Sequence, residues 1–332
     1  MSASTSRTTH ELPTNTHTEC DTRAPGRITA PRYHPTLTTT VPREFVHRTS
    51  IAEVLLTSWE RVDEHRFTVT AQWPRAHSFY THIDGHHDPL LAVETIRQTG
   101  LLLAHTEYGV PLDHHLLLSE LDVTIHPPHL RAGPTPPTLH LDVTCTNIKQ
   151  RRGTLTHCRI NINIYREGHL AATGGGSFTC INPKIYQRLR TPKDPTTQHA
   201  PPISPTAPET PHTVGRTSPN DVVLTPINHP NQWHLRINTH HPTLFDHPLD
   251  HVPGMLLLEA ARQATTATLQ HPTLPHTITS EFTRYVEVGT TCVIEARRLP
   301  ASGADHEEAV LVTAHQDGTP AFRATITTTP PT

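Results

Sequence analysis

The 332-residue sequence has no run of about 18 consecutive apolar residues, so we expect no membrane-spanning helix. Its N-terminus lacks the apolar segment of a secretory signal, which favours the cytoplasm. Only five cysteines are present, an odd number without a CxxC pair, and this argues against a disulfide framework and a zinc site. Neither sign of charge is in large excess, since the net charge is -3, and no basic block supports nucleic-acid binding.

Hydrophobic residues are also scarce, at 34% of the chain, so part of it must lie outside any packed core. Residues 1–40 are rich in Thr, Pro and Ser and are predicted to form a disordered tail. Residues 183–212 are predicted to form a Pro/Thr-rich linker. Histidine is abundant, with 29 residues, so a single histidine carries little information unless an internal pattern selects it.

The rest of the chain repeats itself. Three blocks match in the same order, at offsets of 168, 165 and 161 residues. They are HRTSIAEVLLT (47–57) with GRTSPNDVVLT (215–225), HIDGHHDPLLAVETIRQ (82–98) with HPLDHVPGMLLLEAARQ (247–263), and SEL (119–121) with SEF (280–282). Because the order is kept and the offset drifts only slightly, we infer an internal duplication of one domain.

Both halves show the same order of elements. A strand-like stretch (66–72 and 233–238) precedes one long apolar helix, and alternating strands rich in Thr, Val and Ile follow. The first helix is predicted to begin with Asp88 as its N-cap, followed by Pro89, and the second to begin with Pro253 in its first turn. The second helix is apolar nearly all round and should be buried. A buried helix wrapped by an antiparallel sheet, twice, predicts an α+β tandem hotdog fold with domains at 41–182 and 213–330.

Each predicted helix carries a Glu, an Arg three residues later, and then a Gln. They are Glu94, Arg97 and Gln98 in the first half and Glu259, Arg262 and Gln263 in the second. Residues three and four apart are neighbours on a helix, so each set forms one polar cluster. Two interpretations stay open: buried ion pairs that fix the helix to the sheet, or a carboxylate that faces a substrate cavity and orients a proton.

His247 and His251 lie just before the second helix, and the repeat places His82 and His86 at the matching positions. Prolines within this stretch keep it from being helical, and no third ligand has a recognisable spacing, so we predict no metal. The pair is therefore either catalytic or part of a braced turn.

The start of the second helix is a candidate oxyanion site. Gly254 has no side chain, so a thioester carbonyl can approach the free backbone amides closely. We expect the amides of Gly254 and Met255 to stabilise the negative charge that develops on this oxygen.

Several strings together resemble the A-factor biosynthesis hotdog family, over about residues 41 to 330. They are VPREFVHRTSIAEVLLT, HDPLLAVETIRQTG, GGGSFTC, YQRLR and DHPLDHVPGMLLLEAARQ. The resemblance implies two fused hotdog domains and transfer of a β-ketoacyl group to the hydroxyl of dihydroxyacetone phosphate. The donor would be a thioester of acyl carrier protein or coenzyme A. The product would lead to a γ-butyrolactone-type signal that controls secondary metabolism.

The string PGMLLLEAARQA also resembles the helix of β-hydroxyacyl-carrier-protein dehydratases. In those enzymes a His before the helix and a Glu within it carry out the acid–base chemistry. Glu259 matches that Glu, but the position of the dehydratase His falls on Phe245, which counts against simple dehydration.

Together these features predict an acyltransferase without a cofactor. His247 or His251, supported by Glu259, would take the proton from the attacking hydroxyl. The phosphate needs cationic partners, for which the candidates are Arg97, Arg262, Lys184, Arg188 and Arg190. The last three are alternatively a solvated basic surface or a contact for the carrier protein. The first half is expected to wall the substrate cavity. The substrate-binding residues are predicted to include His82, His86, Glu94 and Gln98 of the first half and Gln263 of the second.

Two other functions stay open at this point. One is a hotdog dehydratase or thioesterase acting on similar thioesters, and the other is a non-catalytic protein that binds an acyl chain or a butyrolactone. Product analysis separates these functions. The chain is expected to be a monomer with an internal pseudo-dimer, or a homodimer.

Overall fold

The computed structural model describes residues 38–190, 206–300 and 307–329. The helices are α1 (Pro89–Thr106), α2 (Pro183–Arg190) and α3 (Gly254–Leu269), with short 3-10 helices η1 (Arg43–Val46), η2 (Ile51–Glu53), η3 (Pro127–Leu130) and η5 (Pro211–Val214). The strands are β1 (Leu56–Arg61), β2 (Arg66–Gln72), β3 (His115–Ile125), β4 (Thr138–Arg151), β5 (Thr154–Arg166), β6 (His169–Ile181), β7 (Leu224–Pro226), β8 (Gln232–Leu235), β9 (Leu274–Phe282), β10 (Cys292–Arg298), β11 (Glu308–Gln316) and β12 (Thr319–Thr329). Residues 1–37 of the predicted tail and 191–205 of the predicted linker lie outside the described residues, so for these residues both stay predictions. The linker prediction was wrong at its two ends, because residues 183–190 form α2 and residues 211–214 form η5.

The strands join into one antiparallel sheet in the described part of the chain. Their order is β1-β2-β4-β5-β6-β3-β9-β12-β11-β10-β8-β7, which reads as the same set of strands from either edge towards the middle. The two halves meet where β3 pairs with β9. This order is what two copies of one domain give when they pair edge to edge, and it confirms the tandem hotdog fold predicted from the repeat.

Equivalent residues face each other at the seam between the halves. Glu120 of β3 lies directly opposite Glu281 of β9, so the pseudo-two-fold axis passes between them. Like charges in opposite positions on paired strands repel. Each carboxylate therefore has its own arginine: Arg159 donates to Glu120 at 3.4 Å, and Arg323 donates to Glu281 at 2.7 Å.

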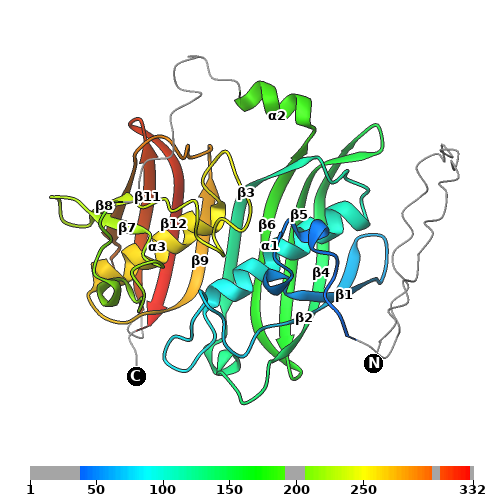
Figure 1. Ribbon diagram of the computed structural model, residues 1–332. Helices are drawn as coiled ribbons and strands as arrows, with labels where there is room; N and C mark the ends of the chain where they lie inside the picture. Colours follow the sequence, from blue (N-terminus) through cyan, green and yellow to red (C-terminus); the bar gives the residue numbers. More distant parts are fainter. Residues whose placement is uncertain (1–37, 191–205, 301–306, 330–332) are drawn as a thin grey trace, which may run out of the picture. The chain divides into compact units, whose positions relative to one another are not determined.

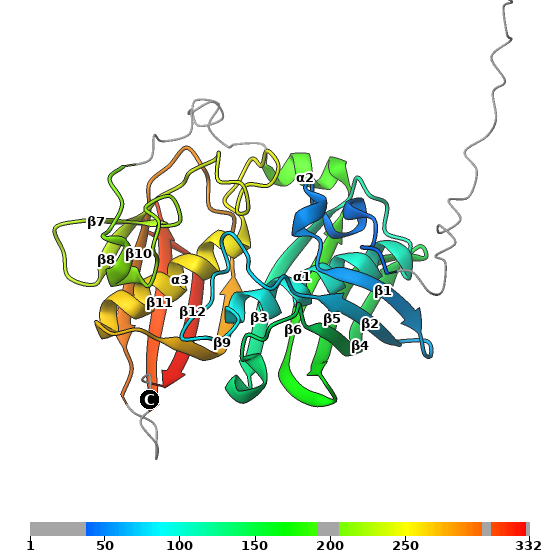
Figure 2. The ribbon, with the colours of Figure 1, turned by 60° about the horizontal axis from the view of Figure 1, so that its bottom comes forward.

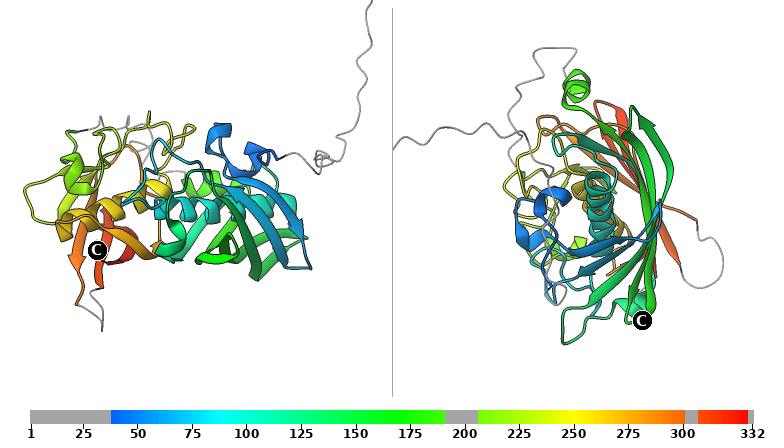
Figure 3. Two further views of the ribbon diagram at one scale, coloured as in Figure 1. Left: turned by 90° about the horizontal axis from the view of Figure 1, so that it is seen from below. Right: turned by 90° about the vertical axis from the view of Figure 1, so that its right-hand side faces the viewer.

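Both long helices lie on the same face of the sheet (Figures 1 and 2). Seen end-on, the sheet curves around α1 (Figure 3, right). Sixteen of the eighteen residues of α1 are buried, as a helix that is apolar on nearly every side requires. Burying a Leu or Ile side chain contributes about 1.5–3 kcal/mol, so the packing of these two helices provides much of the core.

The two helices begin differently. Asp88 accepts a hydrogen bond from the amide of Leu90 at 2.9 Å, so it is the N-cap predicted for α1, and Pro89 follows it. The prediction for the second helix was wrong by one residue. Pro253 has an extended backbone and occupies the N-cap position, and α3 begins at Gly254 without a side-chain cap. A proline at this place fixes the chain direction but offers no side-chain oxygen to the first-turn amides.

Among the described residues, no helix combines the length and the hydropathy needed to cross a membrane.

Strand β6 passes very close to α1 at Gly174. A Cβ atom there would lie 2.8 Å from Cδ1 of Ile96 and closer still to the carbonyl oxygen of Asp122. We expect Gly174→Ala to lower the free energy of unfolding by about 1–3 kcal/mol, because the added methyl group has no space. Urea unfolding followed by circular dichroism measures this change.

Gly133→Ala is the matched control. Its Cβ would have Nη2 of Arg166 as its nearest neighbour, at an ordinary contact distance of 3.4 Å, so stability should hardly change. Equal destabilisation by both substitutions would contradict the close approach of β6 to α1.

Candidate active site

Glu259 is completely buried on α3 and is surrounded by donors. Arg216 donates to it from Nε at 2.8 Å and lies 2.7 Å away through Nη2, while Arg262 donates at 2.6 and 3.0 Å. The amide of Gln263 donates to the same carboxylate. We call Glu259, Arg216, Arg262 and Gln263 the second carboxylate cluster.

Glu94 on α1 has the same surroundings. Arg48 contacts it through Nη2 at 2.7 Å, Arg97 donates at 2.7 and 2.8 Å, and Gln98 donates at 2.7 Å. We call Glu94, Arg48, Arg97 and Gln98 the first carboxylate cluster. The two clusters are related by the repeat, since Arg48 and Arg216 occupy matching positions in the HRTS and GRTS blocks.

One arginine of each cluster also connects the two halves. Arg48 donates to the carbonyl oxygen of Thr243 in the second half at 3.0 Å, and Arg216 donates to that of Phe79 in the first half. Each guanidinium therefore binds a carboxylate of its own half and a backbone carbonyl of the other. These bonds fix both helices relative to the opposite domain.

The electrostatics of Glu94 and Glu259 follow from these contacts. Burial alone would raise the pKa of Glu259, but the guanidinium groups of Arg216 and Arg262 outweigh it and hold the pKa well below the usual value. Arg48 and Arg97 do the same for the pKa of Glu94. Both carboxylates are therefore ionised at neutral pH and have no tendency to take a proton. The geometry agrees with the buried ion pair, which was one of the two interpretations left open by the sequence.

A cavity of about 720 Å³ lies between the two halves of the described fold. Its wall is largely apolar and is formed by residues of α1, β3, β6 and α3, including Leu101, Leu118, Phe178, Leu257 and Leu258. Its polar lining residues come from both halves: His47, Arg48, Arg97, His115, Ser119, Thr179, Tyr186, Thr243, Asp246, His247, His251, Thr283, Arg284 and Tyr285. An apolar wall with a few polar groups suits a ligand that has an acyl chain and a polar end.

The start of α3 opens onto this cavity. Gly254 and Met255 line it, and the N-cap residue Pro253 makes no side-chain hydrogen bond to the amides of the first turn. A Cβ atom on Gly254 would lie 3.2 Å from the ring of Phe282, so a glycine lets this ring approach the helix start closely. Free amides at a helix start attract negative charge. By contrast, Asp88 caps the start of α1 and is itself buried.

One group of polar residues lies around Arg97. The side chain of Arg97 is 23% exposed, whereas its counterpart Arg262 is 2% exposed. Nearby, His247 lies 3.7 Å from Asp246, measured from Nδ1 to Oδ2, and Asp246 accepts a hydrogen bond from the amide of Ser50 at 3.0 Å. Burial lowers the pKa of His247, and the cations Arg48 and Arg97 lower it further, although Asp246 opposes this.

A second group of polar residues lies beside α2. Nδ1 of His251 lies 2.7 Å from Asp250, and the hydroxyl of Tyr186 donates to the same carboxylate at 2.7 Å. Arg190 donates to Asp250 at 3.1 Å and also binds Glu287. The ring of His115 stacks on that of Tyr186, with centroids 3.5 Å apart. The position of His251 is therefore fixed from α2.

The structure places the residues predicted from the sequence in three locations. His247, His251, Gly254, Met255 and Arg97 line the cavity. Glu94, Gln98, Glu259, Arg262 and Gln263 are buried in the carboxylate clusters and are not among its lining residues. His82, His86, Arg188 and Arg190 do not line it either. His82 and His86 flank a tight turn in which Asp84 and Gly85 have positive φ. The backbone of His86 forms an isolated antiparallel bridge with that of Arg131.

Several cavity residues were not singled out as site residues from the sequence. Arg48 had a signal, because it repeats as Arg216, and Tyr186 lies in the YQRLR string. His47 and Asp246 also lie in such strings, but His47 is matched by a glycine in the other half. His115 and Tyr285 had no signal, because nothing local distinguishes them from other His and Tyr residues. They come together only through the fold.

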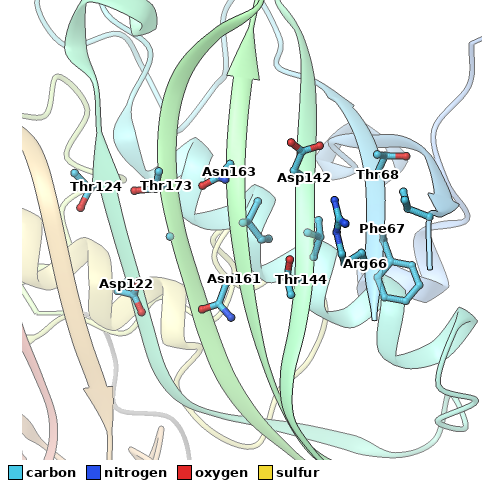
Figure 4. Close-up of a pocket in the computed structure, with 14 residues that line it drawn as sticks. Arg66, Phe67, Thr68, Asp122, Thr124, Asp142, Thr144, Asn161, Asn163 and Thr173 are labelled. Atoms are coloured by element: carbon cyan, nitrogen blue, oxygen red, sulfur yellow. The ribbon is translucent and has the colours of Figure 1, made fainter. Parts of the chain in front are cut away.

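A second hollow of about 460 Å³ lies on the outer face of the sheet (Figure 4). Its side chains are short and polar, and include Asp122, Asp142, Asn161, Asn163 and Thr173. They are the outward-facing residues of strands whose alternate residues enter the core. This hollow lacks an apolar wall, so the cavity beside α3 is the better candidate.

Two hotdog domains in one chain, with a cavity that both halves line, define the class of this molecule as a double-hotdog protein. A family model described as the A-factor biosynthesis hotdog domain matches residues 29–182 and 197–331. The chain belongs to this family, which confirms the resemblance carried by its motifs.

Curated relatives cover most of the chain. A protein of Streptomyces virginiae is 47% identical over 293 residues, which cover 88% of this chain and 98% of that protein. A protein of Streptomyces coelicolor is 40% identical, covering 86% of this chain and 90% of its own length. Both are named 2-oxo-3-(phosphooxy)propyl 3-oxoalkanoate synthase. Among solved structures, an acyl-ACP thioesterase from Bacteroides thetaiotaomicron aligns with a TM-score of 0.49 at 13% identity, covering 79% of this chain and 97% of that one.

Glu259→Gln should be strongly destabilising, because it removes the carboxylate that pairs with the buried Arg262 and leaves Arg216 only Asp88, 4.0 Å away, as a counter-charge. We expect a loss of about 3–5 kcal/mol of unfolding free energy at pH 7. The folded-state pKa of Glu259 is lowered, so this contribution is present above the usual value of 4.5 and is lost as the pH falls further. The difference between wild type and variant should therefore shrink below pH 4.5, as measured by urea unfolding at several pH values.

Glu295→Gln on β10 is the control, since this residue is exposed and should leave stability unchanged. A Glu259→Gln variant as stable as this control would show that the cluster does not hold the helix.

Proposed function

We propose that the chain is an ester-forming acyltransferase that moves a 3-oxoacyl group from a thioester to the hydroxyl of dihydroxyacetone phosphate. The name of the relatives describes such a product, an ester of a 3-oxo acid with a phosphorylated three-carbon ketone. The observation that carries the proposal is the 47% identity to one of these synthases over 98% of its length. The ester would serve the synthesis of a γ-butyrolactone-type signal.

The thioester has a suitable place in the cavity. Its acyl chain fits the apolar wall between α1 and α3, and its carbonyl oxygen can approach the uncapped amides of Gly254 and Met255. These amides would stabilise the oxyanion that forms when the hydroxyl attacks. Transfer then needs no nucleophilic side chain, because the acceptor hydroxyl attacks the thioester directly.

The phosphate of the acceptor has a cationic partner in Arg97. This residue uses Nε and Nη2 to bind Glu94, and its Nη1 has no hydrogen-bond acceptor among the described residues. Arg48 lines the same part of the cavity. Arg262, also predicted for this role, is buried in its own cluster, so we assign the phosphate to Arg97.

The proton of the attacking hydroxyl passes to one of the histidines that line the cavity. His247 and His251, predicted for this step, stay candidates. Glu259 is unsuited to support either of them, because its oxygens are occupied by Arg216, Arg262 and Gln263.

We propose that α2 receives the acyl carrier protein. Tyr186 and Leu189 line the cavity, while Lys184 and Arg188 are exposed on the same short helix. The side chain of Leu189 is also largely exposed, at 60%. Basic and apolar side chains beside the cavity suit an acidic protein that delivers a thioester through a flexible arm.

Mass spectrometry of the products tests the proposed reaction. The protein is incubated with a 3-oxoacyl thioester, with and without dihydroxyacetone phosphate. A phosphorylated ester that needs both substrates is expected. Free acid or an enoyl product, formed regardless of the triose, would identify a thioesterase or a dehydratase instead. Binding without turnover would identify an acyl or butyrolactone binder.

Arg97→Gln should weaken the binding of the triose phosphate. A hydrogen bond between charged groups contributes about 1.5–3 kcal/mol, so we expect the KM for dihydroxyacetone phosphate to rise roughly 10- to 100-fold. The KM for the thioester should stay nearly constant. Arg297→Gln, an exposed arginine on β10, is the control. An unchanged KM for the triose, in a variant that unfolds at the wild-type urea concentration, would remove Arg97 from this role.

Lys184→Glu combined with Arg188→Glu should impair only the protein-bound donor. We expect the KM for the thioester on acyl carrier protein to rise several-fold and its salt dependence to weaken, because two attractive charges become repulsive. The KM for the same acyl group on N-acetylcysteamine should not change. Equal effects on both donors would place the carrier protein elsewhere.

A further inference from the structure

The duplication allows one position to be compared in both halves. His47 and Gly215 match at the offset of 168 residues, each ends a short 3-10 helix, and each precedes an arginine of a carboxylate cluster. Both have left-handed backbones, with φ of 51° at His47 and 69° at Gly215. Glycine adopts this conformation readily, whereas histidine is strained in it. The first half therefore keeps a histidine where the second half has the residue that suits the backbone.

The side chain at this position lies in different surroundings in the two halves. His47 lines the cavity beside α3. At Gly215, an added Cβ would lie 3.3 Å from Nη1 of Arg262, so the corresponding space is already filled. A strained residue that projects into a cavity, where its counterpart is a glycine, suggests a role in function.

The hydrogen bonds of His47 fix its tautomer. Nδ1 of the buried His105 lies 2.7 Å from the carbonyl oxygen of Val110, which can only accept, so this nitrogen carries the hydrogen. Nε2 of a neutral His105 is then an acceptor, and Nε2 of His47, 2.8 Å away, donates to it. Nδ1 of His47 is therefore left with a free lone pair, since the side-chain hydrogen bond of His47 among the described residues uses Nε2.

We propose that His47 accepts the proton of the attacking hydroxyl through Nδ1, and that His105 is the positioning residue that fixes its tautomer. The hydroxyl oxygen bonds to the thioester carbon while its proton moves to Nδ1. The tetrahedral intermediate then expels the thiolate. The thiolate takes the proton from Nδ1 of His47 and leaves as a thiol. The proposal rests on the acyl transfer proposed above.

The surroundings of His47 keep its ring neutral but also make it a weak base. Burial, followed by the neighbouring His105, Arg97 and His247, lowers the pKa of His47 to about 3, so its lone pair is free at neutral pH. The positive charge that the ring gains forms together with the negative charge of the oxyanion, so the two compensate each other.

His47 is better placed for this step than the two histidines predicted from the sequence. Dihydroxyacetone phosphate has only three carbons, so its hydroxyl must lie near the cation that binds its phosphate. His47 and Arg97 line the same cavity, and Nη2 of Arg97 lies 3.4 Å from the carbonyl oxygen of Val46, the residue before His47. By contrast, His251 lies among Tyr186, Tyr285 and Asp250 beside α2. His247 is near Arg97, but its 3.7 Å separation from Asp246 is too long for a hydrogen bond and leaves its tautomer open.

The decisive variant is His47→Gly, which introduces the residue of the other half in the same backbone conformation. We expect it to fold and to unfold at nearly the wild-type urea concentration. Its kcat for ester formation should fall about 100- to 10,000-fold, as the loss of a proton acceptor does. Added imidazole should restore part of the activity, because the variant has a space of matching size beside the substrate.

Gln270→Gly is the matched control. Gln270 is the exposed C-cap of α3 and has a left-handed backbone with φ of 62°. Glycine relieves the backbone strain at this position, which does not line the cavity, so kcat should be unchanged. His47→Asn is the second variant if the glycine variant unfolds, since asparagine tolerates this conformation but cannot take the proton. His105→Phe should lower kcat and change the imidazole ¹⁵N shifts of His47 from those of an Nε2–H tautomer.

The outcomes separate this proposal from the acyl transfer on which it rests. A wild-type protein that forms no ester refutes the transfer itself. A wild type that forms the ester, with a folded His47→Gly or His47→Asn variant within threefold of its kcat, refutes the role of His47. Loss of activity that imidazole does not restore, with ¹⁵N shifts that show a hydrogen on Nδ1 in the wild type, also refutes it. Loss with imidazole rescue supports it.

Discussion

The fold depends on two carboxylates that are buried together with arginines. A buried charge is costly unless it is paired and hydrogen-bonded, so Glu94 and Glu259 require the donors around them. Arg48 and Arg216 satisfy these carboxylates and also bind backbone carbonyls of the opposite half. One interaction thus sets the position of each helix on the sheet and of each half against the other. These contacts therefore also fix the relative positions of α1 and α3, which form part of the cavity wall.

The two halves share a framework but differ where the chemistry would occur. Asp88 caps and closes the start of α1, whereas α3 begins at Gly254 with its first amides uncapped beside the cavity. Arg97 reaches the cavity, and its counterpart Arg262 is buried. The cavity therefore combines the open helix start of the second half with the exposed cation of the first. Neither half alone contains both.

Much of the architecture could be predicted from the sequence, because it follows from local patterns and their repetition. The helix caps at Asp88, the apolar helices and the duplicated polar residues are all visible within short segments. Only one of the two arginines that bind Glu259 could be predicted from the sequence. Arg262 is three residues away on the same helix, but Arg216 lies 43 residues earlier. Spacing alone could not tell a buried ion pair from a carboxylate in a cavity, since the two differ only in partners that are distant in the sequence.

The cavity histidines show the same limit in another form. The repeat selected His82 and His86 together with His247 and His251, yet only the second pair lines the cavity. A turn through Asp84 and Gly85 carries the first pair elsewhere, and a duplicated sequence preserves residues whether or not they keep a role. His47 escaped notice because its counterpart is a glycine, so the comparison of the halves becomes informative only when the backbone angles are known.

The pairing of β3 with β9 has a consequence for how such a molecule can change. In a homodimer of identical chains, every substitution appears twice, so a residue that closes one helix start closes both. In this chain the seam joins two segments that are encoded separately, and Glu120 and Glu281 can each acquire its own arginine. Because the two halves are joined in one chain, a single substitution can close the helix start of one half while that of the other half stays open. A symmetric dimer cannot acquire this difference by single substitutions.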